Sequence, residues 1–190
     1  MAWPNDLQVA LKEWATVCTA LARGRQIILL RKGGIHESGG EFEIEHRRFL
    51  LFPTYLHQNP AMLKEDQQAS VVKLSAEPAK IEISAAAEIT DIIPMTSRAT
   101  MDAIDDQHIW TKPLIDMRFN YRPENPLYLL LGRAYRLSQP ITIDNTPAYA
   151  GCKSWVPLET SVQTTGAAAV LDDAQFAKRR NAILHRVKAP

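Results

Sequence analysis

The chain has 190 residues, of which 46% are hydrophobic and 23% are charged, with 22 lysines and arginines against 21 acidic residues. This composition predicts one globular domain with a substantial core, and it excludes disordered and collagen-like proteins, because the 8 glycines and 12 prolines are scattered. A net charge of +1 also argues against a protein that binds polyanions through bulk charge alone.

The first predicted element is an amphipathic helix over residues 5–23. Leu7, Leu11, Trp14, Cys18 and Leu21 follow one another at spacings of four and three, which is typical of one helix face. The helix would be capped at its start by an asparagine and stopped by a glycine. On this prediction the thiol of Cys18 faces the core, where free cysteines usually serve packing only.

The middle of the chain alternates predicted strands and helices. Strands are expected at residues 26–31, 42–46 and 49–52, a helix at 59–74 and a long strand at 80–93, because apolar residues form short runs or alternate with polar ones in the strands. Two short helices follow at 97–110 and 112–121.

The last third of the chain contains the most apolar strand, predicted over residues 127–137, and a short one around Ile141 and Ile143. A terminal amphipathic helix is predicted over 172–188, with its basic residues outside. The elements indicate an α+β fold, either a mostly antiparallel sheet or a small β-barrel, flanked by helices. We expect a domain at 1–162, a linker-like segment at 163–171 and a C-terminal helix at 172–190.

The even charge count conceals an uneven distribution. Residues 1–60 carry 7 basic and 6 acidic side chains, residues 61–106 carry 4 and 9, and residues 107–190 carry 11 and 6. The basic C-terminal half can present a basic face if the acidic middle packs elsewhere. The alternative is that each segment only has a charged, solvated outer side.

The location of the protein follows from what the sequence lacks. No apolar run approaches the roughly 20 residues that cross a bilayer, and the N-terminus has no basic and then apolar signal pattern. Two cysteines, Cys18 and Cys152, provide no framework of disulfides. We therefore expect a soluble cytoplasmic protein that does not associate with membranes.

Several small motifs resemble sites, but a structural role is favoured for each. The pair Gly33 and Gly34 lacks the lysine and hydroxyl residue of a phosphate-binding loop, so a turn is favoured. A row of glutamates at 41, 43 and 45 resembles the solvent side of an edge strand more than a metal site. His46 and His57 lack the paired spacing of a zinc site. We expect no metal and no cofactor.

The densest group of reactive and aromatic residues is the segment 149–156, Tyr-Ala-Gly-Cys-Lys-Ser-Trp-Val. It places a thiol, a cation, a hydroxyl and an indole next to one another after a flexible glycine. A second group, at 52–58, runs from a predicted strand into a loop that contains a hydroxyl, a phenol, an imidazole and an amide. Loops that leave a rigid sheet commonly carry the groups that contact ligands.

The sequence resembles a known family at several ordered motifs. These are Leu-Lys-Glu-Trp at 11–14, Ile-Leu-Leu-Arg-Lys-Gly-Gly-Ile at 28–35, Glu-His at 45–46, Phe-Leu-Leu-Phe-Pro-Thr at 49–54, His-Gln at 57–58, Arg133, Tyr-Arg-Leu at 135–137 and Gly-Cys-Lys-Ser-Trp-Val at 151–156. Together they resemble the bacterial family catalogued as domain of unknown function eighteen-oh-two, over about residues 7–160. The family has no established activity, but the resemblance implies a link to nucleic-acid metabolism or defence.

The order of elements is also similar to that of the PUA-like superfamily, which includes the ASCH and EVE domains. In those domains a helix leads through a glycine into a strand that ends in a basic residue, as Trp14, Gly24, Arg31 and Lys32 do here. This resemblance implies a small barrel that binds RNA or modified bases.

Three functions remain open from the sequence. The favoured one is a module that binds DNA or RNA, through a single-stranded or modified base. The alternatives are a scaffold that binds a protein partner, and a hydrolase or nuclease that uses His46, His57 or Cys152. The residues expected to contact a ligand are Arg31, Lys32, Thr54, His57, Tyr149, Cys152, Lys153, Ser154 and Trp155.

Overall fold

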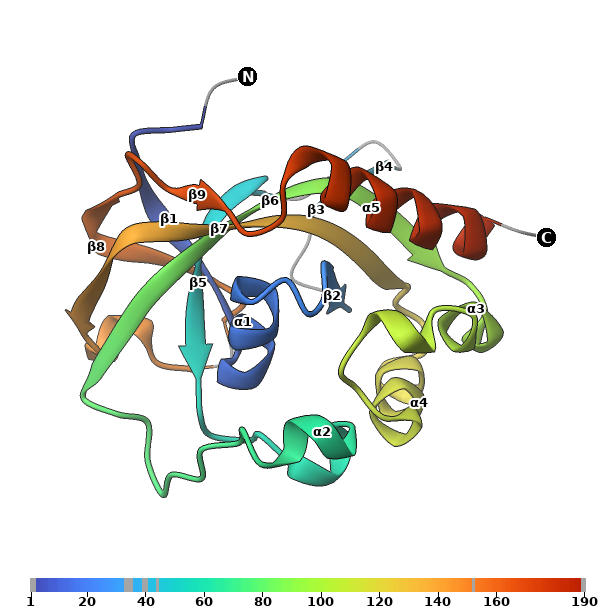
Figure 1. The fold of residues 1–190 in the computed structure, drawn as a ribbon. Helices are drawn as coiled ribbons and strands as arrows, with labels where there is room; N and C mark the ends of the chain where they lie inside the picture. The colour runs from blue at the N-terminus through green and yellow to red at the C-terminus, as the bar shows by residue number, and fades with distance from the viewer. Residues whose placement is uncertain (1–2, 33–35, 39–40, 44, 152, 189–190) are drawn as a thin grey trace.

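A long antiparallel pair, β6 (Lys80–Met95) and β7 (Leu127–Asp144), crosses the whole molecule (Figure 1). The computed structural model describes residues 3–32, 36–38, 41–43, 45–151 and 153–188. The two strands stay in register from Ile81 opposite Ile143 to Met95 opposite Leu127, with two irregularities along the way. Both predicted strands are confirmed, and the short strand predicted at Ile141 and Ile143 is the far end of β7.

Four further strands complete the path of the main sheet. Its order is β2 (Ile28–Arg31), β7, β6, β5 (Arg48–Thr54), β1 (Asp6–Trp14) and β8 (Trp155–Gln163), while β9 (Ala168–Ala169) pairs with β7. All neighbours are antiparallel except β1 and β5. A separate hairpin joins β3 (His36–Ser38) and β4 (Glu41–Glu43).

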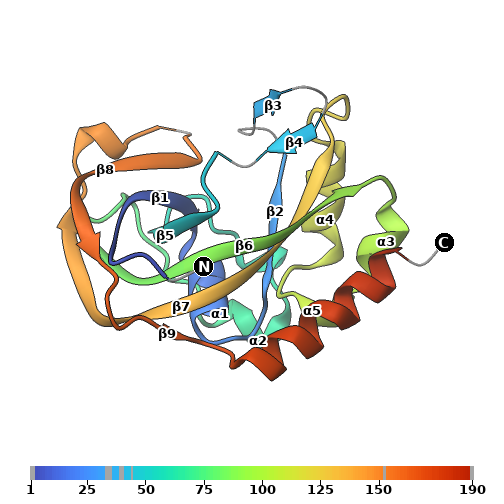
Figure 2. The ribbon, with the colours of Figure 1, turned by 90° about the horizontal axis from the view of Figure 1, so that it is seen from above.

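The predicted α+β class with a mostly antiparallel sheet and flanking helices is confirmed. Among the described residues β2 and β8 form the two edges of the sheet and do not pair with each other, so the sheet is open. Figure 2 shows how strongly it curls, with β6 and β7 passing across the other strands.

Helices surround the sheet on one side and at one end. α1 (Ala15–Ala22) packs against β5, β6 and β7, while α3 (Arg98–Asp102), α4 (Lys112–Asn120) and α5 (Asp173–Lys188) gather near the ends of β6 and β7 (Figures 1 and 2). The short elements are η1 (Pro60–Met62), α2 (Glu65–Gln68), η2 (Asp105–Gln107) and η3 (Pro147–Tyr149). The larger of two buried clusters joins α1, β2, α4 and α5, and the smaller one lies under β1, β8 and part of β5.

The helix predicted over residues 5–23 is wrong for its first half. Residues 6–14 form β1, and only Ala15–Ala22 are helical. The strand lies between β5 and β8, so it is covered on both faces: Leu11 belongs to the larger cluster and Ala10 to the smaller one. A strand buried on both sides does not show strict alternation, which is why its apolar spacing imitated a helix.

The helix predicted over 59–74 is also mostly wrong. Asn59 caps the short η1, and α2 spans only four residues. Beyond it Val71 packs partly against the larger cluster, whereas Val72 and Leu74 are exposed, so little packing stabilises a helix in that stretch. The other predicted helices correspond to α3, α4 and α5, with shorter bounds for the first two.

The C-terminal part of the chain is tied to the rest by packing and hydrogen bonds. Phe176 and Ile183 of α5 are buried in the larger cluster. In the segment predicted to be linker-like, the Thr164 hydroxyl donates to the Pro4 carbonyl at 2.7 Å, and the Val170 amide donates to the Ala134 carbonyl. The division at 163–171 stays a prediction. Among the described residues, no helix is long and apolar enough to span a membrane.

Candidate ligand-binding cleft

A cleft of about 820 Å³ opens where β1 and β5 end. Because these two strands are parallel, with Trp14 opposite Thr54, their carboxyl ends meet at the same edge of the sheet. The last three residues of β1, Thr54 at the end of β5 and the residues just beyond it line the cleft, together with residues from the segments 145–151 and 153–154, which precede β8. Six residues that the sequence predicted as ligand contacts line it: Arg31, Thr54, His57, Tyr149, Lys153 and Ser154. That they contact a ligand stays a prediction.

The turn that follows β5 is held by a carboxylate. Glu77 accepts hydrogen bonds from the backbone amides of Tyr55 and Leu56, at 2.8 to 3.1 Å. The next residue, His57, has a φ of +68°. A side chain in this left-handed region is uncommon, and such backbones persist where the surroundings enforce them, often at binding sites. The held turn keeps the exposed imidazole at the cleft.

One buried carboxylate and two arginines form the floor of the cleft. The Arg31 guanidinium lies 3.0 Å from a carboxylate oxygen of Glu13, and the two side chains are only 12% and 8% exposed. Arg31 also donates to the Lys12 carbonyl at 2.9 Å. The Glu13 carboxylate in turn accepts a bond from the Trp14 amide. These contacts leave the Nε of Arg31 buried without a hydrogen-bond partner among the described residues.

Arg118, which reaches the cleft from α4, has no carboxylate partner of its own among the described residues. It makes no ion pair or hydrogen bond to any residue that the structure describes, and its Nε is buried. Burial lowers the pKa of its guanidinium; the charge of Glu13 opposes this effect and that of Arg31 adds to it. The group remains a cation at neutral pH, because an arginine loses its proton only far above that range. The floor therefore holds more positive than negative charge.

Two lysines, Lys12 and Lys153, line the walls of the cleft, and Lys12 also holds the loop before β8. Lys12 lines the cleft and donates to the carbonyls of Tyr149 and Gly151, which fixes the loop before β8. Lys153 is exposed in the same wall. In all, four lysines and arginines and two carboxylates line the cleft, so its potential favours an anion.

The aromatic residues of the cleft have different roles. Trp14 is half-buried: it lines the cleft and also packs against the larger buried cluster. Tyr149 also lines it, but the residue is 3% exposed, and its hydroxyl accepts a bond from the Glu159 amide at 2.9 Å. Its ring packs edge to face on Phe52. The Tyr149 side chain thus belongs to the smaller buried cluster, and its contact with a ligand stays a prediction.

Two other predicted contact residues, Lys32 and Trp155, lie outside the lining of the cleft. Lys32 donates to the Phe119 carbonyl at 2.6 Å, near the end of α4. Trp155 packs edge to face on Phe49 and His46, at ring distances of 5.1 and 5.3 Å, and does not line the cleft. Cys152 is outside the described residues.

The positions of the two histidines do not support the hydrolase hypothesis, because they are not brought together in one site. His57 lines the cleft, whereas His46 lies beside Trp155 outside its lining. The second thiol, Cys18, is buried, and burial raises the pKa of this thiol, which keeps it protonated. Among the described residues, no group of three or more histidines, cysteines or carboxylates is arranged to hold a metal ion.

Several residues that line the cleft were not predicted from the sequence, among them Lys12, Glu13, Trp14 and Arg118. Lys12, Glu13 and Trp14 were assigned to a helix, although a cation, a carboxylate and an indole in succession are an unusual end for a core element. If residues 6–14 are predicted to be a strand that pairs with residues 48–54, the three side chains are expected at the same edge of the sheet as Thr54. Arg118 gave no signal, because only the packing of α4 brings it to the cleft.

The comparison with family models agrees with the first resemblance seen in the sequence. The model of a family described as Domain of unknown function (DUF1802) matches residues 10–182. A search of curated proteins finds no significant match. Among solved structures, the ASCH protein of Zymomonas mobilis is similar at 11% identity and a TM-score of 0.46, covering 93% of both chains. A single-substitution mutant of it matches at 12% identity and the same TM-score, over 94% of this chain and 98% of that one. This remote likeness carries no information on function.

Proposed function

The chain belongs to the family described as Domain of unknown function (DUF1802), and since that description names no activity, we propose a function from the cleft: it binds single-stranded nucleic acid and takes one nucleotide inside. The observation that carries this proposal is Arg118, a half-buried guanidinium without a partner among the described residues, beside Arg31. A buried cation that lacks a counter-charge is costly, and an anion in the cleft offsets that cost.

The phosphate of the bound nucleotide is the natural anion for this floor. Arginine presents N–H groups in a planar fork that matches phosphate oxygens, and the guanidinium of Arg118, which lines the cleft, has no hydrogen-bond partner among the described residues. Glu13 already neutralises one of the two guanidiniums, so about one net positive charge remains for the ligand. Lys153, exposed in the wall, is placed to contact a neighbouring phosphate.

The base of the nucleotide has a stacking surface and hydrogen-bonding groups in the same cleft. Trp14 lines the cleft and is the residue that we expect to stack on the base, because stacking on aromatic side chains is the common way in which unpaired bases are held. Thr54, Ser154 and Asn145 line the cleft with hydroxyl and amide groups. A volume of about 820 Å³ is in the range of small-molecule sites.

The overall charge is compatible with this mode of binding. A protein of net charge +1 does not hold nucleic acid by a broad basic surface. A cleft that takes one nucleotide needs few charges, and it gives modest salt dependence. The proposal therefore favours a single strand, or an extruded base, over an intact duplex.

The test is a titration of short fluorescein-labelled single-stranded RNA and DNA with the protein, followed by fluorescence anisotropy at several salt concentrations. We expect Arg118→Gln to weaken binding about tenfold, the effect of losing one charge-assisted hydrogen-bonded contact. It should also make the slope of log affinity against log salt less steep by about 0.7, because one phosphate contact of a single strand is lost.

The matched control is Arg122→Gln, which removes the same charge just after α4 from an exposed arginine outside the cleft lining. It should leave affinity and slope unchanged. The proposal fails if neither oligonucleotide binds at the highest soluble protein concentration. It also fails if the two variants weaken binding equally, because a diffuse basic surface then suffices.

A further inference from the structure

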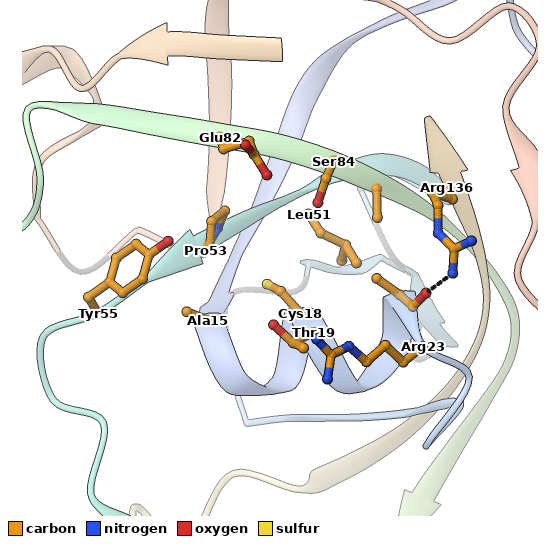
Figure 3. Close-up of a pocket in the computed structure, with 12 residues that line it drawn as sticks. Ala15, Cys18, Thr19, Arg23, Leu51, Pro53, Tyr55, Glu82, Ser84 and Arg136 are labelled. Carbon is orange, nitrogen blue, oxygen red and sulfur yellow. Dashed lines mark hydrogen bonds between the residues drawn. The ribbon is translucent and has the colours of Figure 1, made fainter. Parts of the chain in front are cut away.

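A smaller cavity, of about 320 Å³, lies between α1 and strands β5, β6 and β7 (Figure 3). It shares no lining residue with the cleft. Its two arginines, Arg23 and Arg136, are exposed, and Arg136 donates to the Ala22 carbonyl at 3.0 Å. Water satisfies exposed guanidiniums of this kind, so they indicate no ligand. The guanidiniums of the cleft floor are different, because they are partly withdrawn from solvent.

The core closes the cleft behind its floor. The side chains of Glu13 and Arg31 are only 8% and 12% exposed. Leu11, two residues before Glu13 and on the same face of β1, is buried in the larger cluster, and the buried thiol of Cys18 donates to the Glu13 carbonyl at 3.7 Å. A ligand group that reaches the floor therefore has the core on its far side. An internal phosphate needs room for the strand on both of its sides, whereas a terminal phosphate is joined to the strand on one side only.

Arg118 presents its terminal N–H groups at this floor. The residue is half-buried, it makes no ion pair or hydrogen bond to a described residue, and its Nε is enclosed. The guanidinium therefore offers a ligand its two terminal nitrogens, which match two oxygens of one phosphate. A terminal phosphate has three free oxygens, whereas an internal one has two. The terminal group can thus bind both nitrogens and still accept a hydrogen bond from another donor of the cleft.

The charge of the lining also fits a terminal phosphate. Four lysines and arginines face two carboxylates in the cleft, which leaves two positive charges in excess. An internal phosphate carries one negative charge, whereas a terminal phosphate carries about 1.5 to 2 at neutral pH, since its second pKa is about 6. A terminal phosphate therefore neutralises the excess more completely.

From the closed floor and the excess charge we infer that the cleft recognises the phosphorylated end of a single strand. This inference rests on the proposed function and specifies its ligand. The terminal phosphate binds Arg118 on the floor, the terminal base lies beside Trp14, and the strand leaves along the exposed Lys153. A strand that ends in hydroxyl groups lacks the first of these contacts.

The test is a competition experiment with the full chain, followed by fluorescence anisotropy, in which unlabelled strands of one sequence displace an internally labelled single strand. The competing strands carry a 5′-phosphate, a 3′-phosphate or hydroxyl groups at both ends, and the matching free nucleoside monophosphates are also tested. We expect at least one phosphorylated strand to compete at least about tenfold more strongly than the hydroxyl-ended strand, since it gains a charge-assisted contact. It should also compete more strongly than the free nucleotide, which lacks the rest of the strand.

Variants of three basic residues locate this preference. Arg118→Gln should remove it, so that phosphorylated and hydroxyl-ended strands compete equally. Lys153→Gln should weaken both kinds of strand and keep their ratio. Arg23→Gln is the matched control: it removes an exposed guanidinium at the smaller cavity and should change neither affinity. Thermal unfolding checks that each variant is folded.

The outcomes separate this inference from the proposed function. If strands bind but the phosphorylated and hydroxyl-ended ones compete equally, the inference is overturned and the proposed function stands. The inference is also overturned if the free nucleotide competes as well as the phosphorylated strand, or if Arg118→Gln retains the preference. If no strand binds, the proposed function and the inference both fail.

Discussion

The arginines of α5 and those of the cleft floor differ in how many of their hydrogen-bonding groups have partners within the protein. On α5, Arg180 makes two hydrogen bonds to Asp91, at 2.5 and 2.6 Å, and Arg186 pairs with Asp106 at 2.5 Å. Arg179 of the same helix donates to the carbonyls of Gly24 and Arg25. On the cleft floor, Arg31 and Arg118 have one carboxylate between them.

This difference separates residues that hold the fold from residues that are free to bind a ligand. The sequence allowed the basic C-terminal half to present a basic face, yet Arg179, Arg180 and Arg186 already bind other parts of the protein. The cleft has fewer basic residues but carries the uncompensated charge. The changes below therefore test whether stability is affected on the α5 side and binding on the cleft side.

The largest loss of stability is expected when the buried ion pair between Glu13 and Arg31 is broken. Glu13→Gln leaves Arg31, 12% exposed, without its carboxylate beside the charge of Arg118. Removing one partner of a buried ion pair costs about 3–5 kcal/mol. Urea unfolding followed by tryptophan fluorescence measures the change.

A second variant distinguishes lost charge from lost packing. Combining Glu13→Gln with Arg31→Met removes both charges of the pair, so the double variant should be more stable than Glu13→Gln alone. If the double variant is the less stable of the two, the carboxylate does not compensate Arg31 in the way that the floor geometry indicates.

The next effect depends on pH and lies on the α5 side. His108, adjacent to the residues that bind Arg179 and Arg186, is 5% exposed, and burial lowers its pKa to about 4. The unfolded chain binds this proton near pH 6.5, so the stability gained from a neutral His108 is complete above that pH and is lost as the pH falls toward 4.

The loss from His108 should reach about 3 kcal/mol between these pH values, at 1.36 kcal/mol per pKa unit. Urea unfolding of the wild type and of His108→Gln at a series of pH values measures it. The variant should lack this part of the acid destabilisation. Parallel curves for the two proteins would show that another group is responsible.

A pair of equal charge changes tests the comparison directly. Arg180→Gln breaks two hydrogen bonds to Asp91, whose side chain is 15% exposed, and should cost about 1–3 kcal/mol of stability without affecting oligonucleotide binding. Arg118→Gln should have the opposite pattern: weaker binding with stability unchanged or slightly raised. Thermal unfolding and anisotropy on the same preparations reveal whether the two effects separate.

The smallest effect is expected for the exposed pair at the end of α5. Arg186 and Asp106 have side chains that are 40% and 57% exposed, and exposed ion pairs contribute only about 0–1 kcal/mol. Arg186→Gln should therefore shift the urea midpoint slightly, and added salt should abolish the shift. If the loss of stability is as large as that for Arg180→Gln, the exposure of an arginine does not determine how much its ion pair contributes to stability.

The sequence predicted the sheet better than it predicted the cleft. Long alternating or apolar runs, such as those of β6 and β7, follow from local patterns, and both strands were expected. β1 was mistaken for a helix because it is buried on both faces, a fact that depends on β5 and β8. Pairing between distant segments is not encoded in local spacing.

The same reason explains which site residues were found. His57 and Lys153 were expected from their loops, and the structure brings them to one cleft. Arg118 became visible only through the packing of α4, and Glu13 only once β1 was known to be a strand. The buried state of Tyr149 likewise depends on its contact with Phe52 in another strand.

Hydrogen–deuterium exchange of the wild-type protein, with and without a short single-stranded oligonucleotide, tests the central claim most directly. The account predicts slower exchange in the segments that line the cleft, at residues 12–14, 54–57 and 145–151, and no change along α5. Protection along α5 with none in these segments would contradict it, because the paired arginines and not the unpaired ones would then bind the ligand.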